Sequence, residues 1–346
     1  MIHRNSLLIG LILGSIVAAI LYFFVLERPA DAAEAPRLSF PVDCVIGQDC
    51  WYMAFVDMDS RSTYRDHMCG VRTYDAHKGT DIAPDLSVVN TLTVLAAAAG
   101  RVIGTRDGLD DSPMETEDSG RDAARCGNGV RVDHGDGWTT QYCHMAQGSV
   151  TVSTGDMVEA GHKLGQIGSS GWSELPHLHF QLEKDGAPVD PFLGTVATTN
   201  DQCLASRGLA AGLWHGAGAR NAESYQPVHI RKIGLTTATP TREIAKFGGY
   251  PKTANPDAGV LVAYVVLFGA PAGAKIETLV EGPAGQTIFA NEKIIERDFA
   301  EYFSFAGRKR NGQEWPTGVY TTRVEVSGNG PVGPFAIRAE ADLIIQ

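Results

Sequence analysis

The chain has 346 residues, a length that predicts about two domains. Its 44% apolar and 20% charged residues are the composition of a globular protein with sizeable cores. A net charge of −11 at pH 7 argues against a nucleic-acid partner, because such a partner needs a basic face on the protein.

An uncharged apolar segment lies near the N-terminus. Residues 7–26 contain no charged side chain, and a helix of this length spans about 30 Å, the thickness of a bilayer core. We therefore expect one transmembrane helix in the inner membrane, with Arg4 on the cytoplasmic side and the remainder in the periplasm. The small residues 30–33 keep open the alternative of a signal peptide, with export after cleavage. Residues 1–36 are thus predicted to be an anchor or signal segment with a linker.

The cysteines all follow this segment: Cys44, Cys50, Cys69, Cys126, Cys143 and Cys203. An even set in an exported region predicts disulfides in an oxidising compartment. Cys44 and Cys50 enclose a short segment and are predicted to pair locally, while the other four can pair in three ways. There is no Cys-x-x-Cys, which argues against a thiolate zinc site or a redox motif.

Residues 37–200 are predicted to be a mainly antiparallel β domain, because short β-type runs alternate with Gly-rich turns. The dipeptide Asp136-Gly137 between two alternating runs predicts a hairpin. The expected strands cover residues 93–96, 129–133, 138–142, 149–152 and 163–167.

Residues 107–125 break this pattern, because the stretch is strongly acidic and has almost no apolar side chains. Such a composition cannot form a core and predicts a long surface loop. Two readings stay open: a solvated insertion, and a lid or rim beside a groove.

Residues 201–231 are rich in Ala, Gly and polar side chains and are predicted to be a linker. Evenly spaced strand candidates then follow, which predict a small immunoglobulin-like β-sandwich over residues 232–346. This part contains no His and no Cys, so we assign it no catalytic role. An envelope protein is its candidate partner. Its expected strands cover residues 259–268, 275–280, 301–305 and 318–326.

The segment His177-Leu-His179-Phe-Gln-Leu182 alternates polar and apolar residues. On a strand, His177, His179 and Gln181 lie on one face, and the three apolar side chains lie on the other. Taken alone, the two histidines are as readily a structural or solvent-facing pair. Two further segments, His77-Lys-Gly-Thr-Asp81 and Tyr142-Cys-His-Met145, offer ligands of the type that zinc prefers. A His, an Asp and one His of the pair make three protein ligands and leave a fourth position for water, as in catalytic zinc sites.

In sequence order these segments resemble the lysostaphin-like (LytM-type) zinc metallopeptidases, which cut peptide cross-links in bacterial cell walls. The resemblance covers about residues 69–193 and fails outside them. Besides the three segments above, its matching stretches include Gly127-Asn-Gly-Val-Arg-Val-Asp-His-Gly-Asp-Gly137 and Val189-Asp-Pro191.

The resemblance implies that His77, Asp81 and His179 bind one Zn²⁺ per chain. It implies that His144 and His177 are catalytic histidines, one taking the proton from the attacking water and the other binding the oxyanion or holding the water. The order of these two roles stays open. The implied function is hydrolysis of peptidoglycan stem-peptide cross-links in the cell envelope. Two alternatives remain, a non-catalytic regulatory or wall-binding module and a zinc protease that acts on proteins.

The chain departs from the family's pattern in two places. Cys143 stands where the family has a small residue before the catalytic-type histidine, so either a disulfide stiffens the wall of the site or a free thiol becomes a stray zinc ligand. The turn before the histidine pair contains Trp172, Glu174 and Leu175, which bear on substrate preference. The remaining histidines outside the motifs are predicted to be structural or exposed: His67, His134, His162, His215 and His229.

Overall fold

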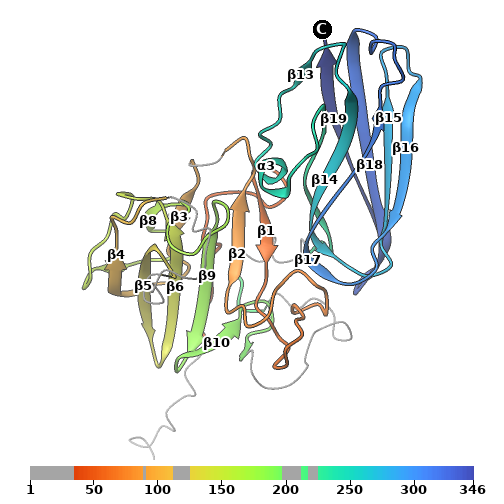
Figure 1. Cartoon of the computed structure of the whole chain (residues 1–346). Coiled ribbons are helices and arrows are strands. Elements are labelled where there is room, and N and C mark those ends of the chain that lie inside the picture. The colour runs from red at the N-terminus through yellow and green to blue at the C-terminus, as the bar shows by residue number, and fades with distance from the viewer. Residues whose placement is uncertain (1–34, 89–90, 112–124, 197–211, 217–224) are drawn as a thin grey trace, which may run out of the picture. The chain divides into compact units, whose positions relative to one another are not determined.

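The computed structural model describes residues 35–88, 91–111, 125–196, 212–216 and 225–346. These residues form mainly antiparallel sheets, as predicted from the sequence, and their single helix is α3 (Arg242–Lys246) (Figure 1). No helix in this part of the chain is long and apolar enough to span a bilayer. The predicted membrane segment, residues 7–26, lies outside the described residues.

The first half of the described chain is organised around one large sheet. Its strand order is β1-β2-β9-β6-β5-β4-β7, with β10 and β11 added at β9 (Figure 1). The neighbouring β3 and β8 pair separately. The bounds are β1 Cys50–Ala54, β2 Thr80–Pro84, β3 Thr93–Leu95, β4 Gly100–Arg106, β5 Asn128–Gly135, β6 Trp138–Met145, β7 Met157–Val158, β8 Lys163–Gln166, β9 Leu178–Lys184, β10 Ala187–Asp190 and β11 Thr195–Val196.

The predicted hairpin joins β5 and β6. Gly135 pairs with Trp138, so the loop consists of Asp136 and Gly137, and both have positive φ (52° and 79°) as a type I′ turn requires. The predicted strand at 149–152 is wrong. The backbone N–H of Val150 donates to the Asp107 carboxylate and that of Ser149 to Ala146, so the single bond from Thr151 to Leu164 of β8 is not extended into a ladder.

The alternation predicted for residues 177–182 is confirmed on β9. Leu178, Phe180 and Leu182 are buried in the core, while His179 and Gln181 lie on the opposite, partly exposed face. The apolar side chains thus fix the strand, and the polar face is left to build a site.

Two disulfides join described residues. Cys44 is bonded to Cys50, as predicted, and Cys126 is bonded to Cys143. The alternative of a free thiol at Cys143 is therefore wrong. Cys69 is also disulfide-bonded.

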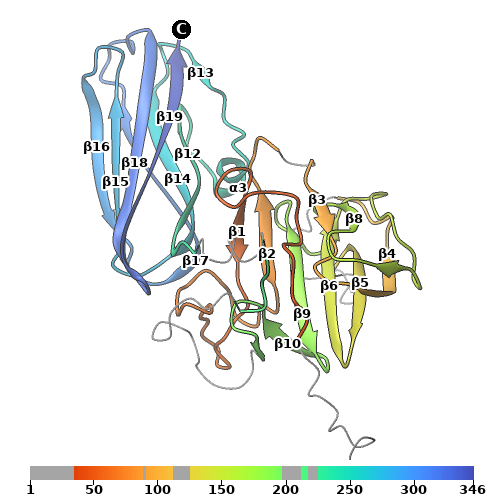
Figure 2. The same cartoon turned by 180° about the vertical axis from the view of Figure 1, so that it is seen from behind.

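The C-terminal part is a sandwich of two sheets over one core. One sheet has the order β12-β14-β17 and the other β13-β19-β18-β15-β16 (Figure 2). Apolar side chains from both sheets, among them Ile233, Val265, Ile276 and Val324, share the core. The bounds are β12 His229–Thr236, β13 Thr253–Ala254, β14 Val260–Ala270, β15 Lys275–Glu281, β16 Thr287–Ile294, β17 Phe299–Lys309, β18 Gly318–Gly330 and β19 Gly333–Ile345. The immunoglobulin type of this sandwich stays a prediction.

Several of these strands differ from the sequence expectation. β12 begins inside the predicted linker, and β16 and β19 were not predicted. β19 does alternate, but its inward positions include the small Ala339 and Ala341 between charged residues, which weakens the apolar signal.

Strand β14 is buried along nearly its whole length. Val265 and Leu267 face the sandwich core, whereas Tyr264, Val266 and Phe268 form a second cluster. That second cluster includes Trp51 of β1 and Ala83 of β2, so the sandwich packs directly on the large sheet. Residues Arg37–Gln346 accordingly form one compact unit.

Asp190 ends β10 as a buried carboxyl group. One of its oxygens accepts hydrogen bonds from the backbone N–H groups of Phe192 (2.9 Å) and Leu193 (2.8 Å), and the other has no partner. Burial raises the pKa of Asp190 from 3.8 to about 7, with a further contribution from Asp66. The folded protein therefore favours the protonated form of this group.

This shift predicts a loss of stability as the pH rises. Because the folded-state pKa is raised, the contribution of Asp190 is fully present below about pH 4 and is lost as pH rises through about 7. A difference of about three in pKa corresponds to about 4 kcal/mol. In Asp190→Asn, the free energy of unfolding should vary less between pH 5 and pH 8 than in the wild type, as measured by urea denaturation. Asp185→Asn, at a carboxylate whose side chain is 71% exposed, should behave like the wild type. Equal pH dependence in both variants would contradict the prediction.

Candidate metal and catalytic site

The strand register brings three of the predicted segments together. On neighbouring strands, Asp81 of β2 lies directly opposite His179 of β9, and His179 lies directly opposite Cys143 of β6. Side chains at directly opposite positions lie on the same face of a sheet. His144, the next residue on β6, is therefore delivered to the same end of these central strands.

His77 reaches this face from the turn before β2. A Cβ atom at Gly79 would lie only 2.7 Å from the imidazole of His179, so the close approach of the turn to β9 requires glycine there. The ring of Tyr74 stacks on that of His77, with centroids 4.3 Å apart. The turn thus places His77 against both the carboxylate and the facing strand.

The three predicted ligands converge on one point. His77 Nε2 lies 3.2 Å from His179 Nδ1 and 3.2 Å from Asp81 Oδ2, and His179 Nδ1 lies 2.8 Å from Asp81 Oδ1. Asp81 is fully buried, and its Oδ2 accepts no hydrogen bond. A buried carboxylate oxygen without a partner is costly unless a cation or proton balances it.

The outer partners of the two imidazoles fix which nitrogen faces this point. His77 Nδ1 lies 2.7 Å from the carbonyl oxygen of Phe55, which only accepts, so Nδ1 carries the proton and Nε2 presents its lone pair inward.

For His179 the same result follows from a line of polar side chains. The Glu183 carboxylate, paired with Arg131, accepts from the amide nitrogen of Gln181 (2.6 Å). The Gln181 side-chain oxygen must therefore face His179 Nε2, at 3.3 Å, and accept a hydrogen bond from its N–H. The lone pair of His179 Nδ1 is left facing His77 and Asp81. Such outer partners hold the orientation and tautomer of metal-ligating histidines.

These residues fit a zinc ion. Two ligand atoms bound to zinc at about 2.1 Å in tetrahedral geometry lie about 3.4 Å apart, close to the spacing found here. The donor set of two imidazole nitrogens and one carboxylate oxygen is of the kind that zinc binds. Within the described residues, His77, Asp81 and His179 could therefore hold one metal ion.

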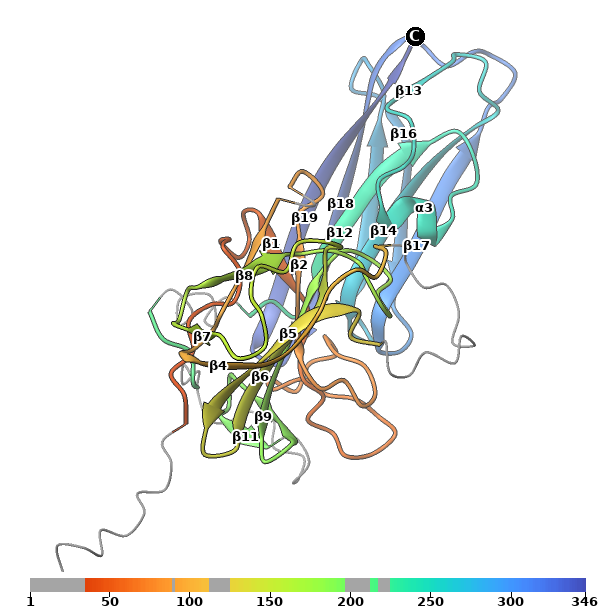
Figure 3. The same ribbon diagram turned by 90° about the vertical axis from the view of Figure 1, so that its left-hand side faces the viewer.

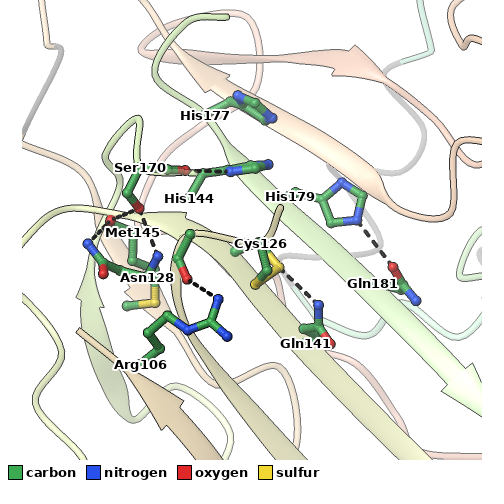
Figure 4. The surroundings of a disulfide bond; sticks show 12 residues. Arg106, Cys126, Asn128, Gln141, His144, Met145, Ser170, His177, His179 and Gln181 are labelled. Atoms are coloured by element: carbon green, nitrogen blue, oxygen red, sulfur yellow. Dashed lines mark hydrogen bonds between the residues drawn. A yellow bond between two sulfur atoms is a disulfide. The ribbon is translucent and has the colours of Figure 1, made fainter. Parts of the chain in front are cut away.

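The two other predicted site residues lie beside these ligands. The rings of His144 and His177 have centroids 4.6 Å apart, and His177 Nε2 is 3.7 Å from Asp81 Oδ1. Each donates through Nδ1 to a backbone carbonyl, His144 to Ser170 (2.8 Å; Figure 4) and His177 to Leu175 (2.8 Å). Both therefore leave Nε2 as the nitrogen with a free lone pair.

Burial and neighbouring charges shift the pKa values of Asp81 and of the histidines around it in different directions. Burial holds the pKa of His144 and of His177 below the usual value, so both are neutral bases at neutral pH. Burial would raise the pKa of Asp81, but the imidazoles around it hold that pKa well below its usual value. Burial likewise opposes a proton on His179, yet the adjacent Asp81 carboxylate raises its pKa.

A disulfide lies directly beneath His144. Cys143 precedes this histidine and is bonded to Cys126, whose carbonyl oxygen accepts from the His144 backbone N–H at 2.8 Å (Figure 4). His144 has a φ of 61°, a left-handed conformation that few non-glycine residues adopt. The structure thus matches the prediction of a stiffened wall at this position.

Sequence reasoning missed the groups that orient the four histidines. The carbonyl oxygens of Phe55, Ser170 and Leu175 leave no signal in the sequence, since every residue carries one. Gln181 could have been found, because it lies two residues beyond His179 on the same face of the strand. Tyr74 lies in an irregular loop and had no such pattern.

The remaining histidines have the structural or exposed positions predicted for them. His134 is hydrogen-bonded to Ala99 and Thr140, His67 stacks on Phe192, and His229 stacks on Trp51. His215 contacts Arg37, and His162 is exposed.

The acidic stretch is described only at its ends. Asp111 accepts hydrogen bonds from the backbone N–H groups of Gln147 and Ser169. The first residues of the acidic stretch thus stabilise two neighbouring loops. Residues 112–124, on which the lid hypothesis depends, lie outside the described residues.

Comparisons with known proteins place part of the chain in a family. Residues 75–191 match the model of peptidase family M23. Over 108 residues the chain is 35% identical to the cell division protein DipM of Caulobacter vibrioides, covering 30% of this chain and 16% of that protein. Over 120 residues it is 32% identical to the peptidoglycan DD-endopeptidase ShyA of Vibrio cholerae, covering 35% and 23% respectively. The chain thus spans less than a quarter of the length of these two relatives.

Among solved structures, the catalytic domain of lysostaphin from Staphylococcus simulans is 27% identical, with 34% of this chain and 76% of that chain covered and a TM-score of 0.25. The family match spans the segments that carry His77, Asp81, His144, His177 and His179. Residues 75–191 are therefore a domain of peptidase family M23.

Proposed function

We propose that this protein is a zinc endopeptidase that hydrolyses peptide cross-links of peptidoglycan in the bacterial cell envelope. The observation that carries the proposal is the convergence of two imidazole lone pairs and a buried carboxylate, with two neutral histidines beside them. The similarity to ShyA, a peptidoglycan DD-endopeptidase by name, supports the substrate class.

His77, Asp81 and His179 are proposed to hold one zinc ion per chain. When bound there, zinc would lower the pKa of a coordinated water and polarise the scissile carbonyl. His177 and His144 each aim a neutral Nε2 at the space beside the ligands, so one can take the proton of the attacking water. The other, whose Nε2 also has a free lone pair, can accept a hydrogen bond from that water and hold it in place. Ser170 and Leu175 keep the two rings in the required tautomer.

Two other functions use the same site. A non-catalytic role is the alternative suggested by the similarity to DipM, whose name states cell division and no peptidase activity. A zinc protease acting on proteins would share the chemistry and differ in substrate. The presence of all five site residues favours hydrolysis over a non-catalytic role.

Metal removal and product analysis test the function. Purified protein incubated with peptidoglycan sacculi should release muropeptides cut within their peptide cross-links, and a chelator should abolish this release until Zn²⁺ is restored. Mass spectrometry of the products identifies the bond. Stoichiometric zinc binding without any release would favour the non-catalytic role, and cleavage of unfolded protein alone would favour a protein substrate.

The two histidines of His177-Leu-His179 should behave differently on substitution. His179→Ala removes a ligand and should lose bound zinc together with activity. His177→Ala keeps all three ligands and should retain zinc while hydrolysis falls by about 10²–10⁴-fold, the usual contribution of general acid–base catalysis. Metal analysis and rate measurement on both variants provide the test. Loss of zinc from His177→Ala would show that the division of roles is wrong.

The Gln181 side chain should influence zinc affinity without contacting the metal. Gln181→Leu removes the acceptor that keeps the proton on His179 Nε2, so the Kd for zinc should rise by about 10–100-fold in a competition titration. Gln141 lies directly opposite Gln181 on β6 and donates to Cys143 Sγ instead. Gln141→Leu is therefore the matched control and should leave the Kd unchanged.

A further inference from the structure

The loop of residues 169–176 orients both histidines that are not ligands. Its Ser170 carbonyl accepts from His144 Nδ1, and its Leu175 carbonyl accepts from His177 Nδ1. The Ser173 hydroxyl also donates to the Leu175 carbonyl at 2.7 Å. A displacement of this loop would therefore turn both rings while leaving His77, Asp81 and His179 in place.

The hydrogen bonds and the close backbone approach to residues beside β5 and β6 hold the first part of this loop. The Ser170 hydroxyl donates to the Met145 carbonyl and accepts from the Asn128 backbone N–H. Gly171 packs against Gly127 so closely that a Cβ atom would lie 2.3 Å from its nitrogen. These contacts end before Glu174 and Leu175.

The sandwich holds the second part. Leu175 is 1% exposed, and its cluster joins Trp51 and Ala83 of the large sheet to Ala245 of α3 and to Tyr264, Val266 and Phe268 of β14. Helix α3 lies beside β14 (Figure 3). The side chain of the residue whose carbonyl orients His177 is therefore enclosed between the large sheet and the C-terminal part of the chain.

A charged contact reinforces this anchor. Lys246, in the last turn of α3, has its ammonium 2.9 Å from Glu174 of the loop and 2.8 Å from Glu301 of β17. Its side chain is only 5% exposed. A nearly buried ammonium needs both carboxylates, because an unpaired buried charge is strongly destabilising. The ion pairs thus connect the loop to both α3 and β17.

From these contacts we infer that the β-sandwich is a positioning element of the M23 site, acting on His177 through Leu175 and the Glu174–Lys246–Glu301 ion pairs. Lys246 touches neither the ligands nor the reacting atoms, so it is a positioning residue. This inference rests on the proposed function for its effect on rate, but the geometry of the histidines can be measured separately.

Lys246→Met tests the inference, since methionine keeps much of the buried chain and removes the charge. We expect kcat to fall about tenfold or more, because small misplacements of catalytic groups are costly, with KM and zinc stoichiometry unchanged. Glu174→Gln should show a smaller loss in the same direction and leaves the Lys246–Glu301 pair intact. The matched control is Lys275→Met, at a lysine that also lies between two glutamates, Glu277 (3.0 Å) and Glu292 (3.7 Å), but in the outer sheet of the sandwich. It should retain the wild-type kcat.

A second measurement does not depend on activity. In ¹⁵N-histidine-labelled protein, the Nδ1–H signal of His177, assigned by its loss in His177→Ala, should exchange slowly with solvent in the wild type and in Lys275→Met. It should exchange faster in Lys246→Met. A kcat and an exchange rate equal to those of Lys275→Met would overturn the inference. If the wild type binds zinc and hydrolyses nothing, the proposed function fails, while the exchange rates still decide whether the sandwich positions His177.

Discussion

The buried carboxylate of Asp81 is the constraint on which the site depends. One of its oxygens has no hydrogen-bond partner, and the side chain is excluded from water on a central strand. Such a group is costly unless a cation or proton balances it, and His77, His177 and His179 converge on it from separate segments. The direct pairing of Asp81 with His179 makes this convergence a property of the strand register. A slip by one residue would send both side chains to the core face.

The same site depends on fixed acceptors around the imidazoles. Three of the histidines donate Nδ1–H to backbone carbonyls, and His179 donates Nε2–H to Gln181. Carbonyl oxygens accept only, so the tautomers follow from the backbone path and need no titratable neighbour. The lone pairs of His77 and His179 thereby face the Asp81 carboxylate. Those of His144 and His177 remain beside it. The division of roles that we propose for these histidines thus follows the backbone path and needs no substrate.

The sequence predicted the parts of this arrangement that have a period or a motif. The alternation of residues 177–182, the Asp136-Gly137 hairpin and the Cys44–Cys50 pair are all found. It could not predict which carbonyls orient the rings, because main-chain acceptors are identical along the chain. It also predicted a strand at 149–152, where Asp107 satisfies the backbone instead. The ring acceptors and the Asp107 contact depend on loops that are distant in the sequence and adjacent in the fold.

Strand β14 shows that the sandwich shares a buried contact with the large sheet and the loop of residues 169–176. A strand of a two-sheet sandwich with one solvated face alternates apolar and polar side chains, whereas β14 is apolar on both faces over residues 260–270. The inner face fills the sandwich core, and the outer face packs on Trp51, Ala83 and Leu175. Since Leu175 carries the carbonyl that orients His177, burial of that outer face is coupled to the geometry of the site. The unbroken apolar run of β14 is therefore the sequence feature that indicates a second buried face. Only the structure identifies the residues that cover this face.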